Sequence, residues 1–146
     1  MSRVLGRTGS VYGDGRWRDF VDKDLYKGWV AYGDDLRKIY RESAFILDVR
    51  QPQARTGLTQ RIFDASACGR AVLSEWSPEL EVLFDPEIEV LSFHNLDEAI
   101  EMKECYLRDP RSAQKRGEQA RQKVLAHHTY RIRAACILEV LRQFKG

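Results

Sequence analysis

The densest group of residues that can bind a ligand begins at Gly57. Gly57, Leu58 and Thr59 come just before a predicted short helix, and the free backbone N–H groups at a helix start bind anions. Arg61 supplies a guanidinium that pairs with phosphate, and Asp64, one turn later, supplies a carboxylate for ribose hydroxyls. These residue types in this order predict a nucleotide-binding segment.

Each of these residues also has a purely structural interpretation. Arg61 and Asp64 are one helical turn apart, so they are close enough to form an ion pair with each other. The residues from Gly57 to Thr59 are equally consistent with an ordinary helix cap, in which Thr59 is an early helical residue. Spacing alone leaves both interpretations open.

A second candidate group contains two glycines and an aromatic residue, Gly13, Gly15 and Trp17. Glycine lets the backbone approach a ligand closely, but a tight turn needs the same residues. Trp17 either stacks on a base or sugar or packs in the core. Arg50 and Arg55 lie in a later loop, where they either reach phosphate or are solvated.

The cysteines and histidines do not form a recognisable catalytic or metal-binding set. No CxxC or HExxH spacing occurs, so no metal ligand and no catalytic residue is assigned. Cys68, Cys105 and Cys136 are odd in number and widely spaced. This pattern is typical of reduced core thiols in a cytoplasmic protein.

Short apolar runs that alternate with helical patterns must position these residues. The predicted strands are 11–13, 29–30, 45–49, 71–74 and 89–93. The predicted helices are 34–43, capped by Asp34 or Asp35, a short helix after Gly57, and helices starting at Ser77–Pro78, Asn95, Pro110 and Thr129. Residues 1–10 are expected to form a tail or a short strand at Arg3–Leu5.

This alternation predicts an α/β fold with a parallel sheet and helices on both faces. In such sheets, ligands bind outside the carboxyl ends of the strands. Three loops are expected at that edge, namely 13–17, 48–57 and 74–78. Their convergence is the structural reason to expect a binding site there.

Length and charge narrow the function classes. With 146 residues, the chain is one domain or half of a two-domain protein. No apolar run is long enough to span a bilayer and no signal peptide is visible, so a cytoplasmic location is expected. The net charge of +2 combines an acidic segment, 75–104, with a basic segment, 108–133. These segments either pair as solvated faces or steer an anionic ligand, and no nucleic acid is expected because the basic segment has no base-reading motif.

Four segments, in the right order, resemble the donor domains of GT-B glycosyltransferases. They are VYGDGRW at 11–17, GLTQRIFDASACGRAVL at 57–73, PELEVLF at 78–84 and HTYRIR at 128–133. Together they are similar to the CgeB/YkvP-type spore-protein glycosyltransferase-like family, within the broader group 1 glycosyltransferases. The resemblance extends from residue 10 to residue 140.

The resemblance implies a single Rossmann-like nucleotide-sugar-binding domain at residues 11–146, with a helical C-terminal segment. A nucleoside diphosphate sugar would be the donor substrate, with no resident cofactor or metal, and an unknown acceptor would receive the sugar. Asp64 stands where the broader enzymes have a glutamate that holds the donor ribose. Thr56 stands where they often have a second glutamate, and Asp48 stands where close relatives often have asparagine.

The resemblance also implies a first strand–helix unit and an N-terminal acceptor domain, both of which are expected to be missing here. Residues 3–5 or a partner chain would take the place of the first strand. An acceptor domain on another chain, or a homo-oligomer, would complete the cleft. The isolated chain is therefore expected to be inactive or weakly active, and the alternative function is a non-enzymatic nucleotide-binding or assembly module.

Overall fold

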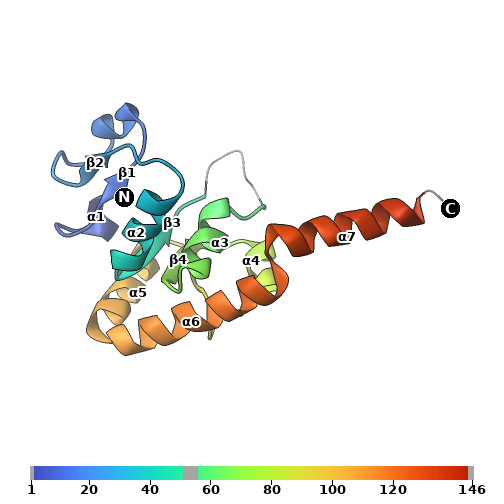
Figure 1. Cartoon of the computed structure of the whole chain (residues 1–146). Helices are drawn as coiled ribbons and strands as arrows, with labels where there is room; N and C mark the ends of the chain where they lie inside the picture. The colour runs from blue at the N-terminus through green and yellow to red at the C-terminus, as the bar shows by residue number, and fades with distance from the viewer. Residues whose placement is uncertain (1, 51–55, 145–146) are drawn as a thin grey trace.

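The computed structural model describes residues 2–50 and 56–144, and its strands form two parallel sheets (Figure 1). The smaller sheet pairs β1 (Val11–Tyr12) with β2 (Tyr26–Gly28). The larger sheet has the order β3 (Phe45–Asp48), β4 (Ala71–Glu75) and β5 (Leu91–Phe93). All described strand pairs are parallel, so the carboxyl ends of β3, β4 and β5 share one edge.

Helices connect and cover these strands. They are α1 (Ser2–Leu5), the 3-10 helix η1 (Gly15–Asp19), α2 (Asp34–Glu42), α3 (Gln60–Ala67), α4 (Pro78–Leu83), α5 (Leu96–Arg108), α6 (Pro110–His127) and α7 (Tyr130–Gln143). Helix α3 links β3 to β4, and α4 links β4 to β5. The predicted α/β fold with parallel strands and a helical C-terminal segment is confirmed.

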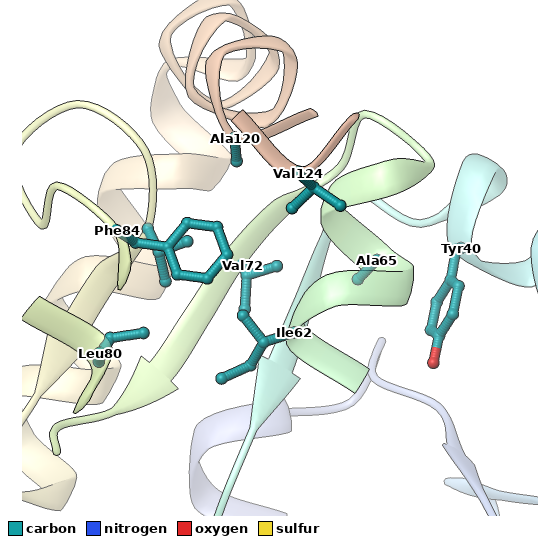
Figure 2. Packing of buried hydrophobic residues seen from close by; sticks show 9 residues of the cluster. Tyr40, Ile62, Ala65, Val72, Leu80, Phe84, Ala120 and Val124 are labelled. Atoms are coloured by element: carbon teal, nitrogen blue, oxygen red, sulfur yellow. The ribbon is translucent and has the colours of Figure 1, made fainter. Parts of the chain in front are cut away.

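Side chains of β4 alternate between the two faces of the larger sheet, as the pleat of a strand requires. Figure 2 shows Val72 in the first core, with side chains from α2, α3, α4 and α6: Tyr40, Ile62, Ala65, Leu80, Phe84, Ala120 and Val124. Ala71 and Leu73 belong to the second core, with Val4 of α1, Phe93 of β5, Ala99 and Tyr106 of α5, and Ala113 of α6. Two cores therefore hold helices against both faces, as predicted.

The predicted helix starts are largely confirmed by their caps. The side chains of Ser77, Asn95 and Thr129 each accept a hydrogen bond from a backbone N–H in the first turn of the helix that follows. The prediction for α2 is wrong, because its N-cap is Gly33, at φ 114°, and no side chain caps it. Asp34 and Asp35 lie inside the first turn, where negative charge still suits the helix dipole.

Two predictions for the N-terminal part are also wrong. Residues Ser2–Leu5 form a helix whose Val4 packs against the α5 side of the larger sheet, not a tail or strand. The second strand is Tyr26–Gly28 instead of 29–30, because the Leu25 and Gly28 carbonyls accept the Val11 and Gly13 N–H groups. This pairing leaves Trp29 exposed and places β1 and β2 in a sheet of their own.

Helix α7 extends away from the rest of the molecule toward the C-terminus (Figure 1). Its apolar positions have the predicted helical spacing, but none of its described residues is buried, and Ile137 and Phe144 are 61% and 83% exposed. Cys105 and Cys136 are exposed as well, so the expectation of core thiols holds for neither, and Cys68 is half-buried. No helix within the described residues is long and apolar enough to cross a membrane.

Candidate functional site

A buried carboxylate at the end of β3 anchors the start of α3. Asp48 has no exposed surface, and its Oδ1 accepts hydrogen bonds from Thr59 Oγ1 at 2.8 Å and from the Arg61 guanidinium at 2.6 Å. The Arg61 side chain is 42% exposed. Arg61 is therefore held at the carboxyl edge of the sheet, with part of its side chain open to solvent.

The N-terminus of α3 keeps its first-turn N–H groups free of a side-chain cap. Thr59 is the N-cap residue, but its hydroxyl donates to Asp48 instead of accepting from the helix. Gly57, just before it, is exposed, and an added Cβ there would meet no atom within 4 Å. The helix start can therefore receive an anion from solvent.

A second ion pair joins the ends of β3 and β4. The Arg50 backbone N–H donates to Glu75 Oε2 and the Arg50 guanidinium donates to Glu75 Oε1, both at 3.2 Å. Both side chains are half-buried. Arg50, predicted to reach phosphate or to be solvated, thus bridges the two strands at the same edge as Asp48. Arg55 lies outside the described residues.

Asp64 lies on the side of α3 that faces α2, in a hollow of about 270 Å³. The hollow is lined by Tyr32, Gly33, Leu36, Arg37 and Tyr40 on one side and by Gln60, Asp64, Ala67 and Cys68 on the other. Burial raises the pKa of Asp64, although a hydrogen bond from the Gln60 side chain opposes the rise. The ion pair between Arg61 and Asp64 that the spacing allowed does not form, because Arg61 pairs with Asp48.

Tyr40 connects this hollow to Arg61. Burial raises the pKa of Tyr40 to about 12, while the positive charge of Arg61 opposes the rise and the negative charge of Asp64 adds to it. Both charges are thus near the Tyr40 hydroxyl. The hollow itself offers a carboxylate and two aromatic rings, from Asp64, Tyr32 and Tyr40. Arg61, which pairs with Asp48, lies one helical turn before Asp64 and outside the residues that line the hollow.

Other predicted site residues have structural roles or lie apart. Leu58 packs against the first core. Gly13 is required by Trp17, because an added Cβ on Gly13 would come within 2.5 Å of the Trp17 ring. Gly15 begins η1 and has open space around its Cα. Gly13 follows β1, and Gly15 and Trp17 lie in η1. No hydrogen bond or ion pair among the described residues links these three residues to Asp48 or Arg61.

Sequence reasoning missed the roles of Glu75, Tyr32 and Tyr40. Glu75 was hidden because it ends an apolar strand whose partner, Arg50, is distant in sequence. Tyr40 packs in the first core and also lines the hollow, and an apolar pattern reveals only the first of these roles. Asp48 carried a visible signal, namely a charged residue at the end of the apolar strand FILD.

His94 stacks on Trp76 just beyond the carboxyl ends of β5 and β4, with ring centroids 5.1 Å apart. His128 packs against the rings of Phe63 and Phe84 near the base of α7. Burial lowers the pKa of His128, and Arg133, His127 and Lys123 lower it further. Within the described part of the chain, no group of three or more His, Cys, Asp or Glu side chains could hold a metal ion.

Comparison with known proteins gives one match. Neither the curated proteins nor the solved structures contain a match to this chain. A family model described as glycosyl transferase-like matches residues 1–139, which is nearly the whole sequence. The match includes the sheet edge formed by β3, β4 and α3 with Asp48, Arg61 and Asp64. This chain belongs to the glycosyl transferase-like family.

Proposed function

We infer that this chain is the donor-binding domain of a GT-B glycosyltransferase of the CgeB/YkvP type. It would bind a nucleoside diphosphate sugar and take part in transferring the sugar to an acceptor. A cytoplasmic location, and an acceptor domain supplied outside these residues, are part of the proposal. The observation that carries it is that Arg61, Asp64 and the uncapped helix start lie within the first two turns of α3, in a chain of this family.

Each part of a nucleotide has a side chain or backbone group that could bind it near the start of α3. Arg61, whose side chain is partly exposed, and the α3 N–H groups would hold the diphosphate. Asp64 would accept hydrogen bonds from ribose hydroxyls, and its raised pKa is consistent with a carboxylate held half-buried for a ligand. Tyr32, which is 77% exposed at the rim of the hollow, would stack on the base.

The chemistry of this chain would be electrostatic. As the bond between sugar and diphosphate breaks, negative charge builds up on the leaving phosphate oxygens. Arg61 is already fixed by Asp48, so it would stabilise that charge with little reorganisation. Arg50 would act by holding the ends of β3 and β4 together, because its backbone N–H and its guanidinium both donate to Glu75.

Calorimetry with the purified chain tests the proposal. UDP, ADP, GDP and dTDP, each with its glucose conjugate, would be titrated into the wild-type protein, Arg61→Gln and Asp64→Asn. We expect at least one nucleotide to bind, and both variants to weaken it. Asp97→Asn, an exposed carboxylate on α5, is the matched control. If none of the eight compounds binds, the donor-binding function is wrong.

The second candidate function is an assembly module, and α7 is the observation that favours it. An isolated helix of this length is marginally stable in water and gains most of its stability from packing. Arg133 stacks on the Phe63 ring near the start of α7, but no described residue of α7 is buried. Its exposed apolar positions therefore suit a partner surface. If light scattering shows that the purified chain is oligomeric, and if no nucleotide binds to it, the assembly function is favoured.

A further inference from the structure

We propose that Asp48 recognises a hydroxyl group of the transferred sugar through its Oδ2 atom. This inference rests on the proposed function, because it assigns a residue to the sugar end of the same donor. It follows from the hydrogen bonds of the carboxylate, from its position in the sheet and from the chemistry of the group that it can accept.

The two oxygens of Asp48 have unequal surroundings. Oδ1 accepts both the Thr59 hydroxyl and the Arg61 guanidinium, whereas Oδ2 is buried and has no hydrogen-bond partner within the described residues. A buried acceptor without a partner is costly, more so on a charged group. The sequence nonetheless places this carboxylate at the end of an apolar strand, which indicates that the second oxygen serves a ligand.

The position of Asp48 makes it part of the candidate donor site. It ends β3 and pairs in register with Ser74, at the carboxyl edge of β4. Ligands of open parallel sheets bind outside this edge. Through Thr59 and Arg61, the carboxylate also contacts the first residues of α3, where the diphosphate would bind.

The chemistry of a carboxylate selects the partner of Oδ2. An ionised aspartate only accepts hydrogen bonds, so its free oxygen pairs with a hydroxyl or N–H group and repels phosphate. Arg61 Nη1 is 2.6 Å from Asp48 Oδ1, so the cation for the phosphate and the acceptor for the hydroxyl are adjacent. A sugar attached directly to the terminal phosphate carries hydroxyls close to that phosphate, and therefore close to Asp48. Because Asp64 is assigned to the ribose, the transferred sugar remains for Asp48.

Asp48→Asn tests this assignment with almost no change in shape. The amide oxygen can still accept from Thr59 and Arg61, and this orientation places an N–H donor where Oδ2 now lies. The ratio of the dissociation constants for UDP-glucose and UDP, or for the pair that binds best, would be measured by calorimetry. We expect Asp48→Asn to weaken the sugar nucleotide about tenfold more than the free diphosphate. Asp97→Asn should leave the ratio unchanged.

The outcomes separate this inference from the proposed function. If the wild-type protein binds diphosphate and sugar nucleotide, and Asp48→Asn leaves their ratio unchanged, only the role of Asp48 is wrong. If the wild-type protein binds neither, the proposed function fails and this role fails with it. Asp48→Ser is the second variant. If thermal melting shows that neither variant folds, Asp48 is a folding residue and the proposal is overturned.

Discussion

The ion pair between Arg61 and Asp48 makes a measurable prediction about stability. Asp48 has no exposed surface, whereas Arg61 is 42% exposed. Exposed pairs contribute about 0–1 kcal/mol, and breaking a buried pair by removing one partner costs about 3–5 kcal/mol. Because this pair is buried on one side only, we expect Arg61→Ala to lower the free energy of unfolding by about 2 kcal/mol.

A double-mutant cycle separates this pair from the local alternative. In an Asp48→Asn background the carboxylate charge is gone, so Arg61→Ala should cost only about 0.5 kcal/mol, which gives a coupling energy of about 1.5 kcal/mol. In an Asp64→Asn background the cost should remain about 2 kcal/mol. Asp64→Asn is the matched control because it removes a charge one helical turn from Arg61.

Urea denaturation followed by circular dichroism at 222 nm provides the six free energies. The slope of each transition also reports whether a variant changes the compactness of the unfolded or native state. If the cost of Arg61→Ala disappears in the Asp64→Asn background and persists in the Asp48→Asn background, Arg61 pairs with its helical neighbour. The site geometry described above would then be wrong.

Three further predictions concern packing and pH. Gly117→Ala should lower the free energy of unfolding by about 1–2 kcal/mol despite the better helix propensity of alanine, because the new Cβ would lie 2.5 Å from the Gly69 carbonyl oxygen. A higher free energy of unfolding in urea denaturation, with the exposed Gln122→Ala variant unchanged, would contradict this close approach. Ionisation of Asp64 destabilises the folded state as pH rises through its raised pKa. Asp64→Asn should therefore raise the melting temperature at pH 7 but not near pH 3, and equal changes in melting temperature at both pH values would refute this. Because the pKa of His128 is lowered, its contribution to stability is fully present above about pH 6.5 and decreases below that pH. His128→Gln should therefore reduce the drop in melting temperature between pH 8 and pH 5, and an unchanged drop would disprove the role of His128.

Local patterns predicted the larger sheet and its helices well. The apolar runs of β3 and β4 and the caps at Ser77, Asn95 and Thr129 depend on neighbours within a few residues, which the sequence displays directly. The short strands β1 and β2 are too short to show a period. Their boundaries depend on pairing with each other, so the second strand was placed incorrectly.

The candidate site was only partly predictable for a related reason. Helical spacing reveals partners one turn away, which is why Asp64 was considered as the partner of Arg61. The actual partner, Asp48, comes from a strand that precedes the loop and is brought close only by the β3–α3 turn. The hollow around Asp64 likewise depends on how α2 packs against α3, which sequence periodicity does not define.

A nuclear magnetic resonance titration shows where on the chain a nucleotide binds, since a 17.0 kDa chain gives resolved backbone amide spectra. The nucleotide that binds best in calorimetry would be added to the 15N-labelled protein. We predict that the largest chemical-shift changes occur at residues 57–64, with smaller changes at residues 32–40. Shift changes confined to other parts of the chain, or an unchanged spectrum at saturating nucleotide, would contradict this prediction.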